Sequence, residues 1–164
     1  MVSDQPAAAP DVCIREAVEA DLPRLMDLLF DLSQLGELPA EAVTPAGEAE
    51  RVALRALQDD SRFSCLVLEV GGRVEGTLTL YVLPNLSHGG RPAAIVENVV
   101  VDSRLRGRGY GRMLMERAET IAREQGCYKV SLTSNRRRID AHRFYERIGY
   151  NPSHQGFTKY RGED

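Results

Sequence analysis

A glycine-rich turn between an apolar run and an amphipathic segment constrains this chain more than any other feature. The run Val99–Val101 is typical of a strand, and Gly107, Gly109 and Gly111 alternate shortly after it. From 109 to 125 the apolar residues repeat at helical spacing, at Leu114, Ala118, Ile121 and Ala122. The segment therefore predicts a strand, a tight turn and a helix in succession.

Such a turn is suited to holding a phosphate group. Glycine lets the backbone turn tightly and approach a ligand, because no Cβ stands in the way. The first amides of the following helix have no partner within it, and the positive end of the helix dipole lies beside them. The spacing differs from the GxGxxG motif, and no Lys-Ser/Thr pair follows as in a Walker loop. The pattern indicates a pyrophosphate site of another kind, with an ordinary solvated turn as the alternative.

The remaining pattern predicts one α/β domain over 11–164, after a disordered segment at 1–10. Strands are predicted at 12–15, 63–70, 73–83, 93–101, 129–133 and 157–160. Helices are predicted after Asp21, after Pro45, from 109 to 125 and from 141 to 148. The polar stretch 36–47 is expected to be a link that is mobile or lies over the surface. This order favours a mixed, mostly antiparallel sheet flanked by helices.

Two expectations concern buried side chains. In the second helix, a repeat at three and four residues predicts one buried face, formed by Ala49, Val52, Ala53, Ala56 and Leu57. The three cysteines, Cys13, Cys65 and Cys127, have no paired spacing and are expected to be buried free thiols.

Composition narrows the range of partners. The formal net charge of -3 gives no general electrostatic reason for binding nucleic acid or an anionic membrane. No apolar stretch approaches the roughly 20 residues that span a bilayer, and the start of the chain does not resemble a signal peptide. We therefore expect a cytoplasmic protein. The histidines His88, His142 and His154 show no metal-ligand spacing, so no metal is expected.

Two segments carry a family resemblance. Arg106 to Gly111 matches in full the signature Arg/Gln-x-x-Gly-x-Gly/Ala, and Ala141 to Tyr150 matches Ala-x-x-hydrophobic-Tyr-x-x-x-Gly-Phe/Tyr. From about Ile95 to Tyr150 the chain therefore resembles the GNAT superfamily of N-acetyltransferases, most closely its sugar-amine branch. The resemblance implies a GNAT-like domain that uses acetyl-coenzyme A as cosubstrate.

The resemblance also implies which residues contact the cofactor. The pantetheine arm would pair with the backbone of one strand, at Val99, Val100 and Val101. The pyrophosphate would lie on the following turn, at Arg106, Gly107, Arg108, Gly109, Tyr110, Gly111 and Arg112. One family position, often an Asn that contacts the cofactor arm, is occupied here by Arg138. Asn135 is a candidate substitute, so both residues are kept as cofactor contacts.

Two residues are candidates for catalysis. Glu97 interrupts an apolar strand, where an ionised carboxylate is costly unless it is used or paired, and it stands at the offset of the Glu in sugar-amine acetyltransferases. It would accept the proton of the amine. Tyr145 corresponds to the family tyrosine that protonates the leaving thiolate. The alternatives are a solvated Glu97 and a Tyr145 that only packs against neighbouring side chains.

The acceptor is expected to be a primary amine of a small polar metabolite, to which the acetyl group passes directly. The alternatives are a protein or peptide N-acetyltransferase and a coenzyme A-binding sensor that has lost catalysis. The presence of both Glu97 and Tyr145 argues against the sensor. A homodimer remains open.

Overall fold

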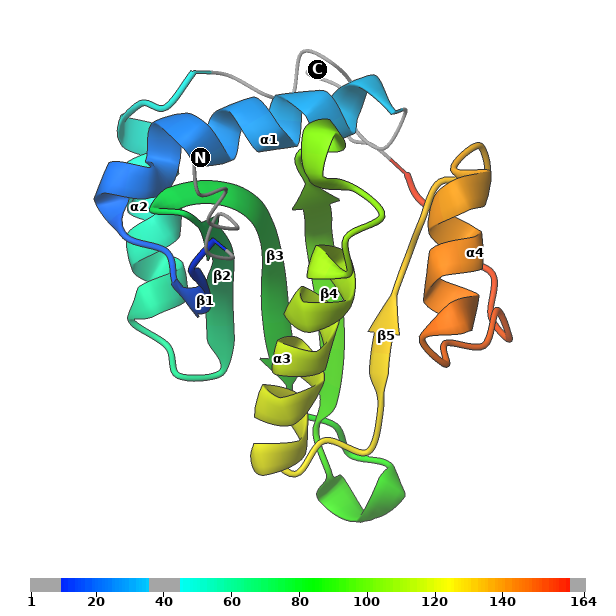
Figure 1. The fold of residues 1–164 in the computed structure, drawn as a ribbon. Coiled ribbons are helices and arrows are strands. Elements are labelled where there is room, and N and C mark those ends of the chain that lie inside the picture. The colour runs from blue at the N-terminus through cyan, green and yellow to red at the C-terminus, as the bar shows by residue number, and fades with distance from the viewer. Residues whose placement is uncertain (1–9, 36–44, 160–164) are drawn as a thin grey trace, which may run out of the picture.

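A single mixed sheet organises the computed structural model, which describes residues 10–35 and 45–159 (Figure 1). Within these residues its strand order is β1-β2-β3-β4-β5. The strands are β1 (Val12–Glu16), β2 (Phe63–Val70), β3 (Arg73–Leu83), β4 (Ala93–Val101) and β5 (Val130–Leu132). The helices are α1 (Leu22–Gln34), α2 (Glu48–Gln58), α3 (Tyr110–Glu124) and α4 (Ile139–Arg147).

The connections determine the directions of the strands. Gly71 and Gly72, both at positive φ, form the tight turn between β2 and β3, as their sequence predicts. The first four strands pair antiparallel, whereas β5 pairs parallel to β4 because α3 carries the chain back across the sheet. The predicted mixed, mostly antiparallel sheet is therefore confirmed.

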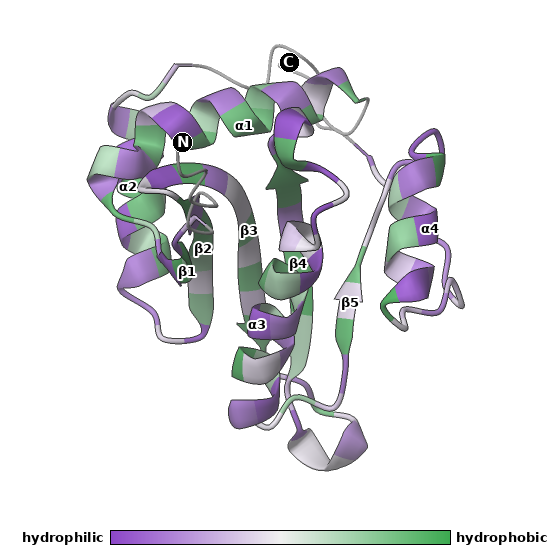
Figure 2. Ribbon diagram, in the orientation of Figure 1, coloured by the Kyte–Doolittle hydropathy of each residue, from purple (hydrophilic) through white to green (hydrophobic). Residues whose placement is uncertain are grey.

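Helices cover both faces of the sheet (Figure 1). On one face, here called the α1 face, Leu25, Leu28 and Leu32 of α1 pack with Leu54 of α2 and with Val67. On the other, the α3 face, α3 packs on β2 to β4 and Tyr145 of α4 joins the same core, with these residues buried: Leu66, Leu68, Leu78, Leu80, Leu114, Met115 and Tyr145. The helices have hydrophobic and hydrophilic sides, as expected when one side covers a sheet (Figure 2).

Several details differ from the sequence predictions. In α2 only Leu54 is buried, and Val52 is 53% exposed, so the predicted buried face is wrong. Alanines repeat at helical spacing there, but the larger side chain of Leu54 is the one that reaches the core. Cys13, on the edge strand β1, is exposed, so the expected buried thiol is wrong there, whereas Cys65 and Cys127 are partly buried.

The C-terminal part of the described chain also differs from expectation. Residues 157–159 form no strand, and Phe157 is 88% exposed. The expectations for 1–9, for 36–44 and for Tyr160 lie outside the described residues. Within the part of the chain that the structure describes, no helix is long and apolar enough to cross a membrane.

An ion cluster fixes the start of α1 against the edge of the sheet. Arg15 on β1 donates to Asp21, which precedes α1, and to Glu69 on β2, at 2.6 and 2.9 Å. Asp21 also accepts a bond from the backbone of Val18. The bonds from Arg15, against the opposing effect of burial, lower the pKa of Asp21 below its ordinary value.

We expect the free energy of unfolding to fall as the pH drops below about 4, the ordinary pKa of an aspartate in an unfolded chain. The pKa of Asp21 is lower in the folded protein, so its ionised form stabilises the fold above this pH. That stabilisation is lost as the pH falls through the folded value. Asp21→Asn should cost about 2 kcal/mol near neutral pH and reduce the acid sensitivity. Urea unfolding across this pH range is the measurement, and an unchanged acid sensitivity in Asp21→Asn would contradict it.

Candidate active site

A bulge in β4 shapes the centre of the site. Thr77 pairs with Val100 and Thr79 pairs with Glu97, so Leu78 alone lies opposite two residues, Asn98 and Val99. Asn98 has a φ of 58°, which is unusual for a residue with a side chain, although Asn tolerates it better than most. Its amide donates to Thr79 Oγ1 at 3.5 Å.

The bulge reverses which side chains face each helix layer. Before it, Ala94 and Val96 belong to the core of the α3 face; after it, Val99 and Val101 pack on that same core. Val100 is buried on the α1 face. Glu97 follows Val96 and so lies on the α1 face by strand alternation. The extra residue thus allows an acidic side chain and an apolar run to share one strand.

The sheet opens at the same place. β4 pairs with β5 only from Ala94 to Val96, with Val130 to Leu132 as partners. Beyond Val96 the two strands diverge, and α4 lies beyond β5 (Figure 1). Among the described residues, no strand therefore lies along the β5 side of Glu97 to Val101. From Asn98 to Val101, this edge of β4 therefore has backbone groups that no strand of the described residues pairs with, and an extended ligand could pair there.

Glu97 has an aromatic neighbour on the α1 face. Burial raises the pKa of Tyr81, and the nearby charge of Glu97 adds to that effect. The ring of Tyr81 packs edge-on against Phe63, with ring centroids 5.5 Å apart. Glu97 itself is partly exposed. A half-buried phenol therefore lies beside the candidate base.

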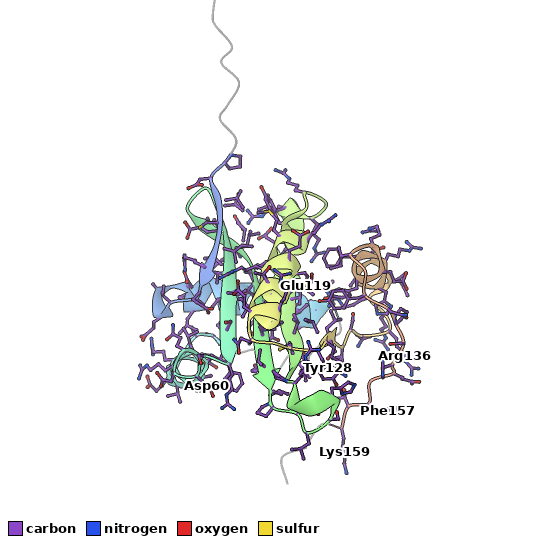
Figure 3. The ribbon with its side chains drawn as sticks, turned by 90° about the horizontal axis from the view of Figure 1, so that it is seen from below. Asp60, Glu119, Tyr128, Arg136, Phe157 and Lys159 are labelled. Atoms are coloured by element: carbon purple, nitrogen blue, oxygen red, sulfur yellow. The ribbon has the colours of Figure 1, made fainter. Side chains whose placement is uncertain are left out.

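Tyr145 lies on the α3 face, opposite to Glu97. It is 7% exposed and belongs to the core there, with Phe144 and Tyr150 as ring neighbours at 5.2 and 6.1 Å. Burial, and then Glu119 on α3 (Figure 3), raise the pKa of Tyr150. The opening between β4 and β5 therefore has the candidate base on one face of the sheet and the candidate acid on the other.

The glycine-rich turn follows β4 directly. Gly107 and Gly109 have φ of 77° and 85°, and a Cβ at either position would meet nothing within 4 Å. Gly109 caps α3, and its carbonyl accepts from Met113 at 3.1 Å. Within the described residues, the amides from 107 to 112 donate to no protein acceptor. The turn is therefore a row of available amides at a helix N-terminus, which is the predicted anion site.

The third glycine has a different role. A Cβ on Gly111 would lie 3.3 Å from the ring of Phe144, so this glycine allows α3 and α4 to approach each other.

The arginines of the turn differ in whether they are already paired. Arg112 pairs along the helix with Glu116 at 2.7 Å, while Arg106 and Arg108 are exposed and make no ion pair with the described residues. Arg106 and Arg108 are thus better placed than Arg112 to add charge to the turn.

The loop after β5 holds the remaining candidates. Asn135 Oδ1 accepts from the backbone of Arg137 at 2.9 Å, and its carbonyl accepts from Arg138, which precedes α4. Both residues therefore build the turn into α4. Ser134, beside them, has a buried hydroxyl with no hydrogen-bond partner among the residues that the structure describes.

Sequence reasoning missed three features of this site: the bulge at Asn98, the phenol of Tyr81 and the ion pairs that Asp102 makes with Arg24 and Arg104. An Asn within a run of valines was the available signal for the bulge.

Two surface hollows of the described structure, beside the start of α1 and beside β2, contain none of the candidate residues. No group of three or more side chains suited to a metal ion occurs in 10–35 and 45–159.

Comparisons with known proteins place this mixed sheet, with its glycine-rich turn, in a family of acyltransferases. Residues 26–150 match the model of the acetyltransferase (GNAT) family. A glucosamine 6-phosphate N-acetyltransferase of Trypanosoma brucei brucei is 32% identical over 85% of this chain and 89% of its own length. An aminoalkylphosphonate N-acetyltransferase of Salmonella typhimurium is 41% identical over 54% of this chain and 56% of its own.

A solved structure gives the same fold. A protein of Bacillus halodurans described as a transcriptional regulator superposes with a TM-score of 0.81, at 31% identity, over 92% of this chain and all of the other. The chain belongs to the GNAT acetyltransferase family and is a transferase.

We expect Asn98→Val to destabilise the protein by about 1–2 kcal/mol more than Asn98→Gly, because a β-branched residue disfavours positive φ. Both variants lose the bond to Thr79, so the glycine variant controls for that loss. Urea unfolding of the two proteins measures the difference. Equal stabilities would show that the bulge does not depend on the conformation of Asn98.

Proposed function

We propose that this enzyme transfers an acetyl group from acetyl-coenzyme A directly to the primary amine of a small polar metabolite. The observation that carries the proposal is the row of amides at 107–112 that donate to no acceptor in the described residues, together with the edge of β4 at 99–101, along which no described strand lies. A pyrophosphate fits the amides, and the amide-containing pantetheine arm fits the strand edge. Membership of the GNAT family supports the same cosubstrate.

The cofactor would be held mainly by backbone. Val99, Val100 and Val101 would pair with the pantetheine arm, and the turn from Arg106 to Arg112 would hold the pyrophosphate. The open space at Gly107 and Gly109 leaves room for the phosphate oxygens. Ser134, together with Asn135 and Arg138, would contact the arm from the β5 side, since the Ser134 hydroxyl is buried and lacks a protein partner.

In this proposal the base, Glu97, and the acid, Tyr145, act from opposite faces of the sheet. The amine would enter from the α1 face and lose its proton to Glu97, directly or through water. The nitrogen, now neutral, forms a bond to the thioester carbon, the carbon–sulfur bond breaks, and the nitrogen releases its second proton to water. A backbone N–H near Val99 would polarise the carbonyl oxygen, and Tyr145 would give its proton to the departing thiolate from the α3 face. Positioning across the opening supplies most of the rate in this scheme.

We expect Tyr145→Phe to fold and bind acetyl-coenzyme A normally but to transfer the acetyl group about 10²–10⁴-fold more slowly, as for loss of a general acid. Tyr150→Phe is the matched control, because it removes a neighbouring buried hydroxyl and keeps the ring. Single-turnover rates with saturating acetyl-coenzyme A compare the two. A wild-type rate in Tyr145→Phe would restrict that residue to packing.

The acceptor that we favour carries a phosphate or phosphonate group in addition to its amine. The names of the two relatives described above combine an amine with such a group. In this chain the C-terminal segment returns to the end of β5, where Gly156 lies beside Thr133. Arg136, Phe157 and Lys159 lie on the same side of the molecule in Figure 3. Arg136, in the loop that follows β5, is therefore a cationic side chain near the open end of the sheet.

We expect kcat/KM to be at least about tenfold higher for glucosamine 6-phosphate or 2-aminoethylphosphonate than for glucosamine, because a charge-assisted contact to the anion is worth at least that factor. Glucosamine is the matched control without the phosphate. A short peptide with a free N-terminal amine tests the alternative that the enzyme acetylates proteins or peptides. A peptide that exceeds every small amine would contradict the proposal.

A further inference from the structure

A buried ion cluster lies at the point where β4 enters the glycine-rich turn. Asp102, the residue after β4, is 5% exposed, and Glu75 on β3 is 8% exposed. Arg24 on α1 donates to both, at 2.5 Å to Asp102 and 2.8 Å to Glu75, and also to the carbonyl of Val74 at 3.0 Å. Arg104 donates to Asp102 through two of its nitrogens, each at 2.8 Å.

These contacts determine how the chain leaves the sheet. The Asp102 amide donates to the carbonyl of Glu75 at 2.8 Å, and its carboxylate accepts from the Arg104 amide at 3.0 Å. Asp102 thereby caps the short 3-10 turn Ser103–Leu105 that leads into the glycines. Glu75 is the extra residue of a bulge in β3, since Leu68 pairs with Gly76 and Glu69 with Val74.

The turn has little else to hold it. The amides from 107 to 112 donate to no acceptor in the described part of the chain, and residues 106–109 are exposed. The orientation of the turn therefore depends on its two ends: Asp102 before it and the packing of α3 after it. A site that is already oriented binds its ligand more tightly, because less ordering is needed on binding.

We propose that Arg24 and Asp102 are positioning residues for the cofactor turn, through which α1 orients the amides that hold the pyrophosphate. This inference rests on the proposed binding of acetyl-coenzyme A at the turn. Neither residue touches the cofactor in this account. Arg24 is suited to the role because one planar guanidinium reaches a carbonyl and two carboxylates that come from separate segments.

The chain offers a matched control in Arg15. It also bridges two carboxylates, Asp21 and Glu69, and it also anchors α1. Its strand β1, however, lies at the edge of the sheet farthest from β5, with two strands between it and β4. Replacing either arginine by lysine keeps the charge but removes the fork that bridges the carboxylates. The two variants therefore lose similar contacts at different distances from the turn.

The experiment compares Arg24→Lys with Arg15→Lys in the full chain. Without cofactor, amide hydrogen exchange of the 103–112 segment should speed up in Arg24→Lys and stay at the wild-type rate in Arg15→Lys. Calorimetry should show acetyl-coenzyme A binding roughly tenfold more weakly to Arg24→Lys alone, as for loss of one charge-assisted bond. In Arg24→Lys the kcat at saturating cofactor should stay near the wild-type value, and the KM for acetyl-coenzyme A should rise.

Exchange and affinity that are equal in the two variants would overturn the inference. Should Arg24→Lys fail to fold, Arg104→Lys replaces it, because that side chain is 60% exposed and donates to the same carboxylate. Hydrogen exchange of the 103–112 segment and the affinity for acetyl-coenzyme A are then compared between Arg104→Lys and Arg15→Lys. Wild-type protein that binds no acetyl-coenzyme A would overturn the proposed function instead, and the exchange comparison would still test whether Arg24 orients the turn.

Discussion

The extra residue in β4 at Asn98 is the constraint on which the rest of the site depends. Asn98 and Val99 both lie opposite Leu78, so the side chains of β4 after this point alternate in the opposite sense to those before it. The pairing of β4 with β5 ends at Val96, next to the bulge. An uninterrupted strand would place Glu97 and the later valines on one regular alternation and would keep its edge paired. The bulge therefore turns Val99 and Val101 to the face opposite to Glu97, next to the point where β4 stops pairing with β5.

Charges that are removed from solvent hold this open arrangement together. Two arginines, Arg15 and Arg24, each bridge a pair of carboxylates and fix α1 against the sheet. Buried ion pairs contribute little net stability, because desolvation offsets much of their attraction, but they constrain geometry when several hydrogen bonds are satisfied at once. Asp102 precedes the glycine-rich turn, and it is held by Arg24 of α1 and by the carbonyl of Glu75 on β3. The position of α1 on the sheet therefore affects where the turn begins.

Patterns local in sequence predicted most of the fold. The strand, turn and helix around Gly107 and Gly109 follow from residue types that are neighbours in the chain, and the glycine pair at 71 and 72 likewise determines a hairpin. The motif around Tyr145 placed that residue on a helix correctly. The face of α2 was wrong because alanines match helical spacing without having the size to fill a core, so Leu54 determines the buried side.

Features that depend on distant pairing could not be read from the sequence. The bulge at Asn98 appears only when β4 is aligned with Thr77 and Thr79 of β3, and Tyr81 becomes a neighbour of Glu97 through the same register. The contacts of Arg24 join segments about 50 and 78 residues apart in the chain. The final strand expected at 157–160 is not formed over its described residues, since β-prone residues alone provide no partner strand.

Binding of acetyl-coenzyme A to two glycine variants of one helix tests the central claim most directly. Gly109 and Gly126 lie at opposite ends of α3, both have positive φ, and a Cβ at either would meet nothing within 4 Å. Alanine at each position therefore introduces similar backbone strain, but only at Gly109 does it disturb the amides proposed to hold the pyrophosphate. Titration calorimetry should show Gly109→Ala binding at least about tenfold more weakly than wild type, with Gly126→Ala unchanged. Equal affinity in the two variants would contradict a cofactor site at this turn.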